Sequence, residues 1–190
     1  MLFRSFVEVD DADRIGGKGA KADVILTRRG APAISISLKN LVKGKGSDMQ
    51  QWSGVSAVLS HPEVASFAAR VKKAHYDGEG SMFWRRINDE DLKKKAVWGP
   101  LGETVEVIVA GTEPRLEPTG EPGMYRIEVG IGKHGVGGVY YKADDVIPGG
   151  ELEPVFFARN EDKKSFGTLK GVRGMIAPIA LATSRKSIEV

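Results

Sequence analysis

The strongest constraint on the fold comes from residues 22–40, ADVILTRRGAPAISISLKN, in which polar and apolar residues alternate. Every second residue is apolar on both sides of RRGAP, and that connecting stretch contains the Gly and Pro typical of a turn. A period of two belongs to a β-strand with one apolar face. The stretch is therefore predicted to be a β-hairpin folded about residue 30 or 31. Such a hairpin brings Asp23 close to Ser37 and Lys39.

The overall composition is that of an ordinary globular protein. With 190 residues, 41% hydrophobic and 28% charged, the chain can bury a self-sufficient core, which argues against disorder and coiled coil. No apolar run is long enough to span a bilayer. The absence of cysteine excludes a disulfide framework, a thiol nucleophile and a cysteine-based zinc site. Charged residues interrupt the start before any apolar block forms, so no export signal and a cytoplasmic location are predicted.

Positive charge is concentrated in one segment rather than spread evenly. The formal net charge of the chain is +3. Between residues 18 and 45 the only acid is Asp23, while seven residues are basic: Lys18, Lys21, Arg28, Arg29, Lys39, Lys43 and Lys45. This pattern fits a nucleic-acid partner, and it equally fits a solvated basic face.

The order of the predicted elements indicates an α+β fold. Residues 1–15 fit either a short helix or a strand. Helices are predicted from Ser47 through Leu59, from Pro62 onward, and over residues 88–97. Strands are predicted at 104–110, 124–131, 138–142, 154–159 and 173–182. We therefore expect one domain, 1–190, with a mixed sheet and helices packed on it: the hairpin at 22–40, helices within 47–97 and C-terminal strands within 104–182.

The polar residues of the hairpin suit phosphodiester hydrolysis. That reaction uses a divalent ion to bind a phosphate oxygen and acidify a water molecule. Magnesium prefers oxygen ligands, such as one or two carboxylates and several waters. Asp23 at the start of one strand can supply a carboxylate, and the Lys39 ammonium on the neighbouring strand can orient the attacking water or neutralise charge on the phosphate.

Asp23, followed by a hairpin and then by Ser37-Leu38-Lys39, resembles the PD-(D/E)XK nuclease superfamily. The pattern of that family is an Asp, a short interval and an acid-X-Lys triplet, and the resemblance covers residues 22 to about 52. It implies a restriction-endonuclease-like core, a mixed sheet flanked by helices, and magnesium-dependent cleavage of DNA, with manganese as a substitute.

Ser37 departs from the family pattern, because it stands where the acid should be. Some restriction enzymes in the superfamily share Ser-X-Lys and recruit an acid from the following helix, where this chain offers Gln50 and Gln51. The sequence leaves several sources open for the missing carboxylate: Glu8, Asp10, Asp11 and Asp48.

The resemblance implies a role for each candidate residue. Asp23 and Glu8 would bind the metal, Lys39 would position or activate the water, and Ser37 with Gln51 would complete the polar shell. The predicted partner is double-stranded DNA, cut by a restriction-like or homing-type endonuclease that acts as a homodimer. Its phosphate contacts would come from Arg28, Arg29, Lys43, Lys45 and Arg173.

Two other functions remain open on the sequence. Asp23 and Lys39 can form a merely architectural cross-strand ion pair in a non-catalytic DNA-binding or phage-type structural protein. An RNA-directed nuclease would differ from the DNA enzyme only in its substrate. The glycine-rich stretch 130–138 does not indicate a P-loop, because it lacks the Gly-Lys-Ser/Thr ending.

Overall fold

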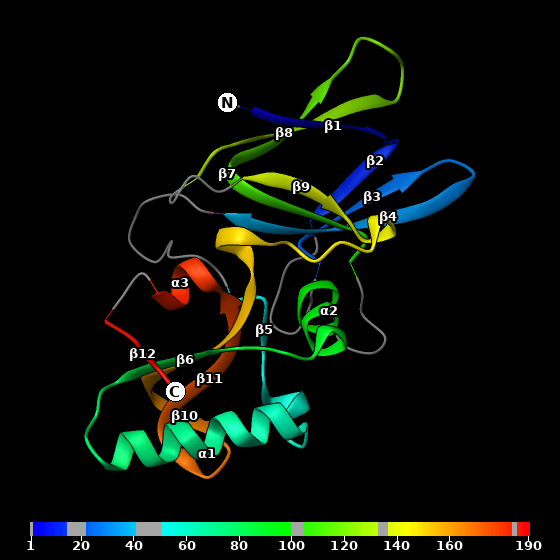
Figure 1. Cartoon of the computed structure of the whole chain (residues 1–190). Coiled ribbons are helices and arrows are strands. Elements are labelled where there is room, and N and C mark those ends of the chain that lie inside the picture. The colour runs from blue at the N-terminus through cyan, green and yellow to red at the C-terminus, as the bar shows by residue number, and fades with distance from the viewer. Residues whose placement is uncertain (1, 15–21, 41–50, 100–104, 133–136, 184–185) are drawn as a thin grey trace. The chain divides into compact units, whose positions relative to one another are not determined.

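The computed structural model describes residues 2–14, 22–40, 51–99, 105–132, 137–183 and 186–190 (Figure 1). The chain divides into two compact units: unit 1 combines Met1–Gln50 with Trp98–Val146, and unit 2 combines Gln51–Val97 with Ile147–Val190. Each unit contains one mixed β-sheet, and the helices are few, so the predicted α+β class is confirmed. The prediction of a single nuclease-like domain over residues 1–190 stays a prediction.

Unit 1 is built on a sheet whose order in the described residues is β1-β8-β7-β4-β3-β2, with β9 also paired to β7. Its strands are β1 (Leu2–Glu8), β2 (Asp11–Arg14), β3 (Val24–Arg28), β4 (Ala31–Asn40), β7 (Val107–Pro118), β8 (Met124–Gly130) and β9 (Gly138–Tyr141), followed by the 3-10 helix η3 (Lys142–Asp144). The predicted hairpin is confirmed as β3 and β4. β4 is central, antiparallel to β3 on one side and parallel to β7 on the other.

The N-terminal segment joins the two edges of this sheet. β1 pairs with β8, and β2 pairs with β3 at the opposite edge. At the corner between them, Val9 N–H donates to Gly123 O at 2.8 Å, and Asp10 N–H donates to Thr27 O at 2.8 Å. The chain therefore changes from pairing with β8 to pairing with β3 across Val9 and Asp10. This brings the two outer strands of the sheet together, so that the sheet is curled around its apolar face.

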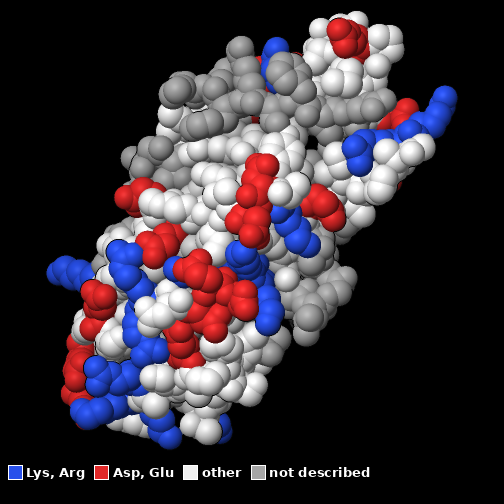
Figure 2. Space-filling view, turned by 45° about the vertical axis from the view of Figure 1, so that its right-hand side comes forward, with Lys and Arg blue, Asp and Glu red and all other residues white. Residues whose placement is uncertain are grey.

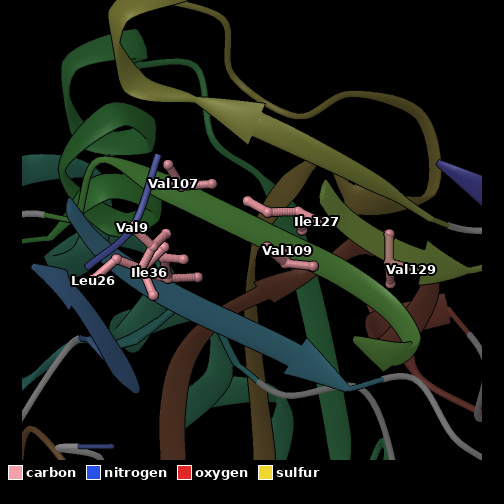
Figure 3. Packing of buried hydrophobic residues seen from close by; sticks show 7 residues of the cluster. All are labelled: Val9, Leu26, Ile36, Val107, Val109, Ile127 and Val129. Carbon is pink, nitrogen blue, oxygen red and sulfur yellow. The ribbon is translucent and has the colours of Figure 1, made fainter. Parts of the chain in front are cut away.

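That apolar face carries the core of unit 1. Seven buried residues form the cluster, as Figure 3 shows: Val9, Leu26, Ile36, Val107, Val109, Ile127 and Val129. β-branched residues dominate it, as expected for side chains that pack well on a pleated surface. Because Ile36 lies opposite Val107 in the parallel pair, the apolar residues of β4 and β7 share one face.

Gly111 marks the point where β7 changes partners. Residues before it pair with β4 and β9, and those after it pair with β8. Its φ is +142°, and a Cβ built there would lie 2.3 Å from Gly130 O and 2.6 Å from Val129 Cγ2. Only glycine fits this position, because both the backbone angle and the close approach of β8 exclude a side chain.

Unit 2 contains a second sheet, ordered β12-β6-β10-β11-β5 in the described residues. Its elements are β5 (Ser53–Gly54), η1 (Ser56–Val58), α1 (Pro62–Tyr76), β6 (Met82–Arg86), α2 (Glu90–Trp98, whose last residue is assigned to unit 1), η4 (Gly150–Leu152), β10 (Pro154–Phe166), β11 (Leu169–Pro178), α3 (Ile179–Thr183) and β12 (Ile188–Glu189). α1 packs on this sheet through Phe67, whose ring stacks on Phe156 with centroids 5.2 Å apart. The predicted helices at Pro62 and over 88–97 are confirmed as α1 and α2.

Local capping explains where these two helices begin. Glu63 N–H donates to Nδ1 of His61 at 3.3 Å, and Pro62 occupies the first turn, where its missing N–H costs nothing. Asp89 caps α2 by accepting a hydrogen bond from Leu92 N–H at 2.8 Å. The Leu92 N–H contributes most to a lowered pKa of the Asp89 carboxyl, and the neighbouring His61 and the Asp91 N–H lower it further.

Three predictions of local structure are wrong. The helix expected from Ser47 through Leu59 begins outside the described residues, and its described part is instead strand β5 and the 3-10 helix η1. The Trp52 N–H donates to Ile176 O at 2.8 Å, so this segment joins the sheet of unit 2. Residues 82–86 form strand β6, which was not predicted, and the strand expected over 173–182 ends at Pro178, where α3 begins. The N-terminal residues, left open by the sequence, form β1 and β2.

Substitution of Gly111 by alanine should destabilise unit 1 strongly. The left-handed φ and the contact with Gly130 O together predict a loss of roughly 3 kcal/mol in the free energy of unfolding. Gly54→Ala is the matched control, because nothing lies within 4 Å of its Cβ position, and it should change stability by less than about 0.5 kcal/mol. Urea unfolding of both variants measures the difference, and equal stabilities would contradict the close approach of β8.

Candidate active site

The Asp23 carboxylate is held against strand β4, as the hairpin pattern predicts. Asp23 stands immediately before β3, and its N–H donates to Ile36 O at 2.8 Å. Its Oδ2 accepts a hydrogen bond from Leu38 N–H at 2.7 Å and lies 3.4 Å from the Ser37 hydroxyl. The carboxylate therefore continues the β3–β4 ladder by one position, and the structure brings Asp23 and Ser37 together.

Lys39 is buried close enough to Asp23 for their charges to interact. It is 8% exposed, and Ser37, two positions earlier on the same face of β4, is fully buried. Burial lowers the pKa of the Lys39 ammonium from its ordinary value, and the Asp23 charge offsets part of that decrease. Asp23, Ser37 and Lys39 thus form a polar group at the C-terminal end of β4.

The apolar core and the polar group lie on opposite faces of the sheet. Ile36 and Leu38 face the core, so Ser37 and Lys39 face the other side, where Ile108 and Ala110 of β7 lie beside them in register. Although Ser37 and Lys39 are polar, neither side chain is exposed to solvent to any large extent.

Within the described part of the chain, the site supplies one carboxylate for a metal. No group of three or more His, Cys, Asp or Glu side chains gathers anywhere among the described residues. Oδ2 of Asp23 is engaged by Leu38 N–H, while Oδ1 has no hydrogen-bond partner among them. Because magnesium is bound in proteins by one or two carboxylates and keeps several waters, the described residues supply the smaller of these two numbers.

The N-terminal acids lie toward the other end of β3. The Asp10 carboxylate accepts a hydrogen bond from Arg29 N–H at the hairpin turn, and Asp11 pairs in register with Thr27. The backbone of Glu8 pairs with Met124 of β8, and its side chain lies outside the described residues, as does all of Asp48. The structure therefore does not bring Asp10 or Asp11 to Asp23, and Glu8 as a metal ligand stays a prediction.

Asp13 is a carboxylate that the sequence did not single out. It lies opposite Ile25, two positions from Asp23, and by the strand alternation it shares the face of Ile25. The side chain is exposed. Little in the sequence pointed to Asp13, because DADR shows no clear alternation and residues 1–15 fitted either a helix or a strand.

Gln51 and Arg173 contact each other in unit 2. Nη2 of Arg173 donates to Oε1 of Gln51 at 2.9 Å, and Nη1 of Arg173 pairs with Oε1 of Glu161 at 3.1 Å. The amide oxygen of Gln51, which was expected to complete the polar shell of the site, thus accepts a hydrogen bond from a guanidinium. The membership of Gln51 in the Asp23 site stays a prediction.

The basic residues that were predicted to contact DNA phosphates differ in their surroundings. The Arg28 guanidinium donates to Pro32 O at 2.9 Å through Nε and at 2.6 Å through Nη2, which closes the hairpin turn. Arg29 is exposed at the same turn, at the end of β3 away from Asp23. Lys43 and Lys45 lie outside the described residues.

In comparisons with protein-family models, with curated proteins and with solved structures, nothing matches this chain. The resemblance to the PD-(D/E)XK superfamily therefore depends on the hairpin residues alone. In the part of the chain that the structure describes, no helix has the length and apolar character needed to cross a membrane.

The pKa of Lys39 predicts a pH-dependent stability. Because the pKa is lowered in the folded state, the unfolded state binds more protons between that value and the ordinary 10.5. The free energy of unfolding of the wild type should therefore rise, relative to that of Lys39→Met, as the pH increases through this range. Urea unfolding between pH 7 and pH 10 measures the difference, with Lys142→Met, an exposed lysine of η3, as the control. A difference that is constant with pH would contradict the burial of a charged Lys39.

Proposed function

We propose that this protein is a magnesium-dependent DNA endonuclease of the restriction-like or homing type. The observation that carries the proposal is that the Asp23 carboxylate, whose Oδ1 accepts no hydrogen bond from the described residues, lies at the same end of the β3–β4 pair as the buried Lys39 ammonium and acts on its charge. Double-stranded DNA as partner, a homodimer and a cytoplasmic location are part of the same proposal.

The topology around the site supports this function. β4 lies between an antiparallel β3 and a parallel β7, so β4 and β7 both run toward the same end of the sheet. Binding sites of sheets with parallel strands commonly lie outside the carboxyl ends of those strands. Lys39 stands at that end of β4. In a restriction-endonuclease-like core, β3 and β4 would be the site-bearing hairpin, whereas the described elements of unit 1 include none of the flanking helices that the resemblance implies, apart from the last residue of α2.

Each residue of the site has a chemical role in the proposal. Asp23 would bind magnesium or manganese through Oδ1, because Oδ2 is occupied by Leu38 N–H, and Ser37 would add a polar oxygen. When bound, the ion would polarise a phosphate oxygen and acidify a water. Lys39 would hold its ammonium near the charge that builds on the phosphate, and its lowered pKa would make its proton easier to give up than that of an exposed lysine.

A second candidate function is supported by the same hydrogen bond. By accepting the Leu38 N–H, Asp23 satisfies a backbone donor that β3 is too short to reach, which is a sufficient structural role for a carboxylate. In that case the Asp23–Lys39 pair is architectural, and the protein is a non-catalytic DNA-binding or phage-type structural protein.

Cleavage of a supercoiled plasmid in magnesium and in manganese tests the proposal. Asp23→Asn keeps an oxygen that can accept the Leu38 N–H but loses the charge, and Lys39→Met keeps the length of the side chain but loses the amine. Each should lower the nicking rate by roughly 10²- to 10⁴-fold without loss of fold. The matched controls are Asp144→Asn and Lys142→Met, both on exposed residues of η3, and both should cleave like the wild type.

Thermal melting separates a lost activity from a lost fold in these variants. A wild-type protein that nicks neither DNA nor RNA in either metal would overturn the nuclease proposal and favour the architectural pair. Cleavage of RNA but not of DNA would show that the substrate is RNA and that the proposed DNA substrate is wrong.

A further inference from the structure

The far end of the β10–β11 hairpin, residues 159–173, carries a concentration of positive charge in unit 2. Three of its lysines, Lys163, Lys164 and Lys170, are exposed. Two arginines add to them, while the acids of this segment are Glu161 and Asp162, so its net charge is +3. We call this segment the basic hairpin end. Figure 2 shows Lys and Arg side chains, with Asp and Glu side chains among them, at the lower end of the view, where Figure 1 has α1 and the β10–β11 turn.

Packing against α1 fixes the basic hairpin end in place. The Phe166 ring lies 5.7 Å from the Phe67 ring of α1, and a Cβ at Gly174 would lie 2.6 Å from Phe166, so the aromatic ring covers that glycine. Nζ of Lys72, on α1, lies 3.3 Å from Oγ1 of Thr168 and brings a further positive charge to the turn. The lysines therefore project from a rigid support.

The backbone itself changes course where the lysines stand. The register of the two strands shifts between Asn160 and Ser165, and Lys163 has a φ of +63°. A lysine in the left-handed region is unfavourable by about 1–2 kcal/mol. Irregularities of this kind commonly redirect side chains at binding sites. Here the irregularity lies where two adjacent lysines are exposed.

Two arginines at the base of this segment share a single carboxylate. Arg159 and Arg173 are directly opposite each other in the antiparallel pair, a position in which like charges repel. Both contact Glu161, at 3.1 Å from Nη2 of Arg159 and 3.1 Å from Nη1 of Arg173. Although desolvation alone would raise the pKa of Glu161, the hydrogen bonds and charges of the two arginines lower it overall, so it stays ionised. One negative charge thus serves two guanidiniums that are each about one-third exposed, 31% and 32%.

We infer that the basic hairpin end is a docking surface for the phosphate backbone of a nucleic acid, with Glu161 as its internal counter-ion. Guanidinium and ammonium groups are the side chains that contact phosphate oxygens, and a rigid hairpin presents several of them together. The choice of double-stranded DNA as the polymer rests on the proposed function, whereas the surface itself does not depend on cleavage.

Fluorescence anisotropy with a labelled DNA duplex, in EDTA and at several salt concentrations, tests the inference on the full chain. The triple variant Lys163→Ala, Lys164→Ala, Lys170→Ala should bind at least about 10-fold more weakly at low salt. The slope of log affinity against log salt should become shallower by about 0.9 for each phosphate that the variant no longer neutralises. The matched control is Lys93→Ala, Lys94→Ala, Lys95→Ala on α2, which removes the same charge from the same unit and should keep the wild-type slope.

Glu161→Gln gives a prediction of opposite sign. Removal of the counter-charge leaves both arginines without their carboxylate partner, with Arg173 keeping its hydrogen bond to Gln51, so the variant should bind the duplex several-fold more tightly. Equal weakening in the two triple variants would show that only net charge matters and would overturn the inference, as would unchanged binding in the hairpin variant or weaker binding in a folded Glu161→Gln variant.

The outcomes separate this inference from the nuclease proposal. Plasmid cleavage by the wild type, together with unchanged binding in the hairpin variant, would overturn the docking surface alone. Hairpin-dependent binding without cleavage in any metal would overturn the nuclease alone.

Discussion

Burial of one face of the β3–β4 hairpin against β7 and β8 is the constraint on which the site depends. Because side chains alternate, a slip of one residue would bring the lysine of β4 into the apolar cluster. The contact of Ile36 with that cluster therefore fixes the position of Lys39 on the opposite face, and the parallel register with β7 holds it there. Closure of the sheet by the N-terminal segment reinforces this register, since β2 pairs with β3 along nearly its whole length.

The burial of Lys39 has an energetic cost that the fold only partly offsets. An ammonium removed from water needs a counter-charge, and the Asp23 carboxylate supplies one while also accepting a backbone N–H. A well-packed apolar residue at position 39 would avoid that cost. Perturbed lysines beside a carboxylate occur both at active sites and in structural ion pairs, so the two functions differ in whether Oδ1 of Asp23, which accepts no hydrogen bond from the described residues, binds a metal.

The sequence predicted those parts of the fold that depend on local pattern. The alternation in 22–40 predicted the hairpin and the proximity of Asp23 to Ser37, and Pro62 with the apolar spacing after it predicted α1. The short helix predicted over 88–97 is α2. The prediction failed where contacts with residues far away in the sequence determine the local structure. Trp52 and Val55 have helical spacing, yet the Trp52 indole donates to Leu152 O, 100 residues away, and its segment joins the sheet of unit 2. The contact of Gln51 with Arg173, 122 residues apart, could not be predicted from spacing for the same reason. The burial of Ser37 and Lys39 also escaped prediction, because alternation shows which face is apolar but not what covers the other one.

The site and the basic hairpin end differ in how far carboxylates compensate their positive side chains. At the site one carboxylate offsets part of the cost of burying one ammonium, and exposure of that lysine to solvent is small. At the hairpin end one carboxylate serves two guanidiniums near the surface, so positive charge remains. A buried pair of opposite charges keeps its geometry without a ligand, whereas an unbalanced exposed group gains from an added anion. The two groups belong to different units, so substitutions can alter either group while leaving the residues of the other unchanged.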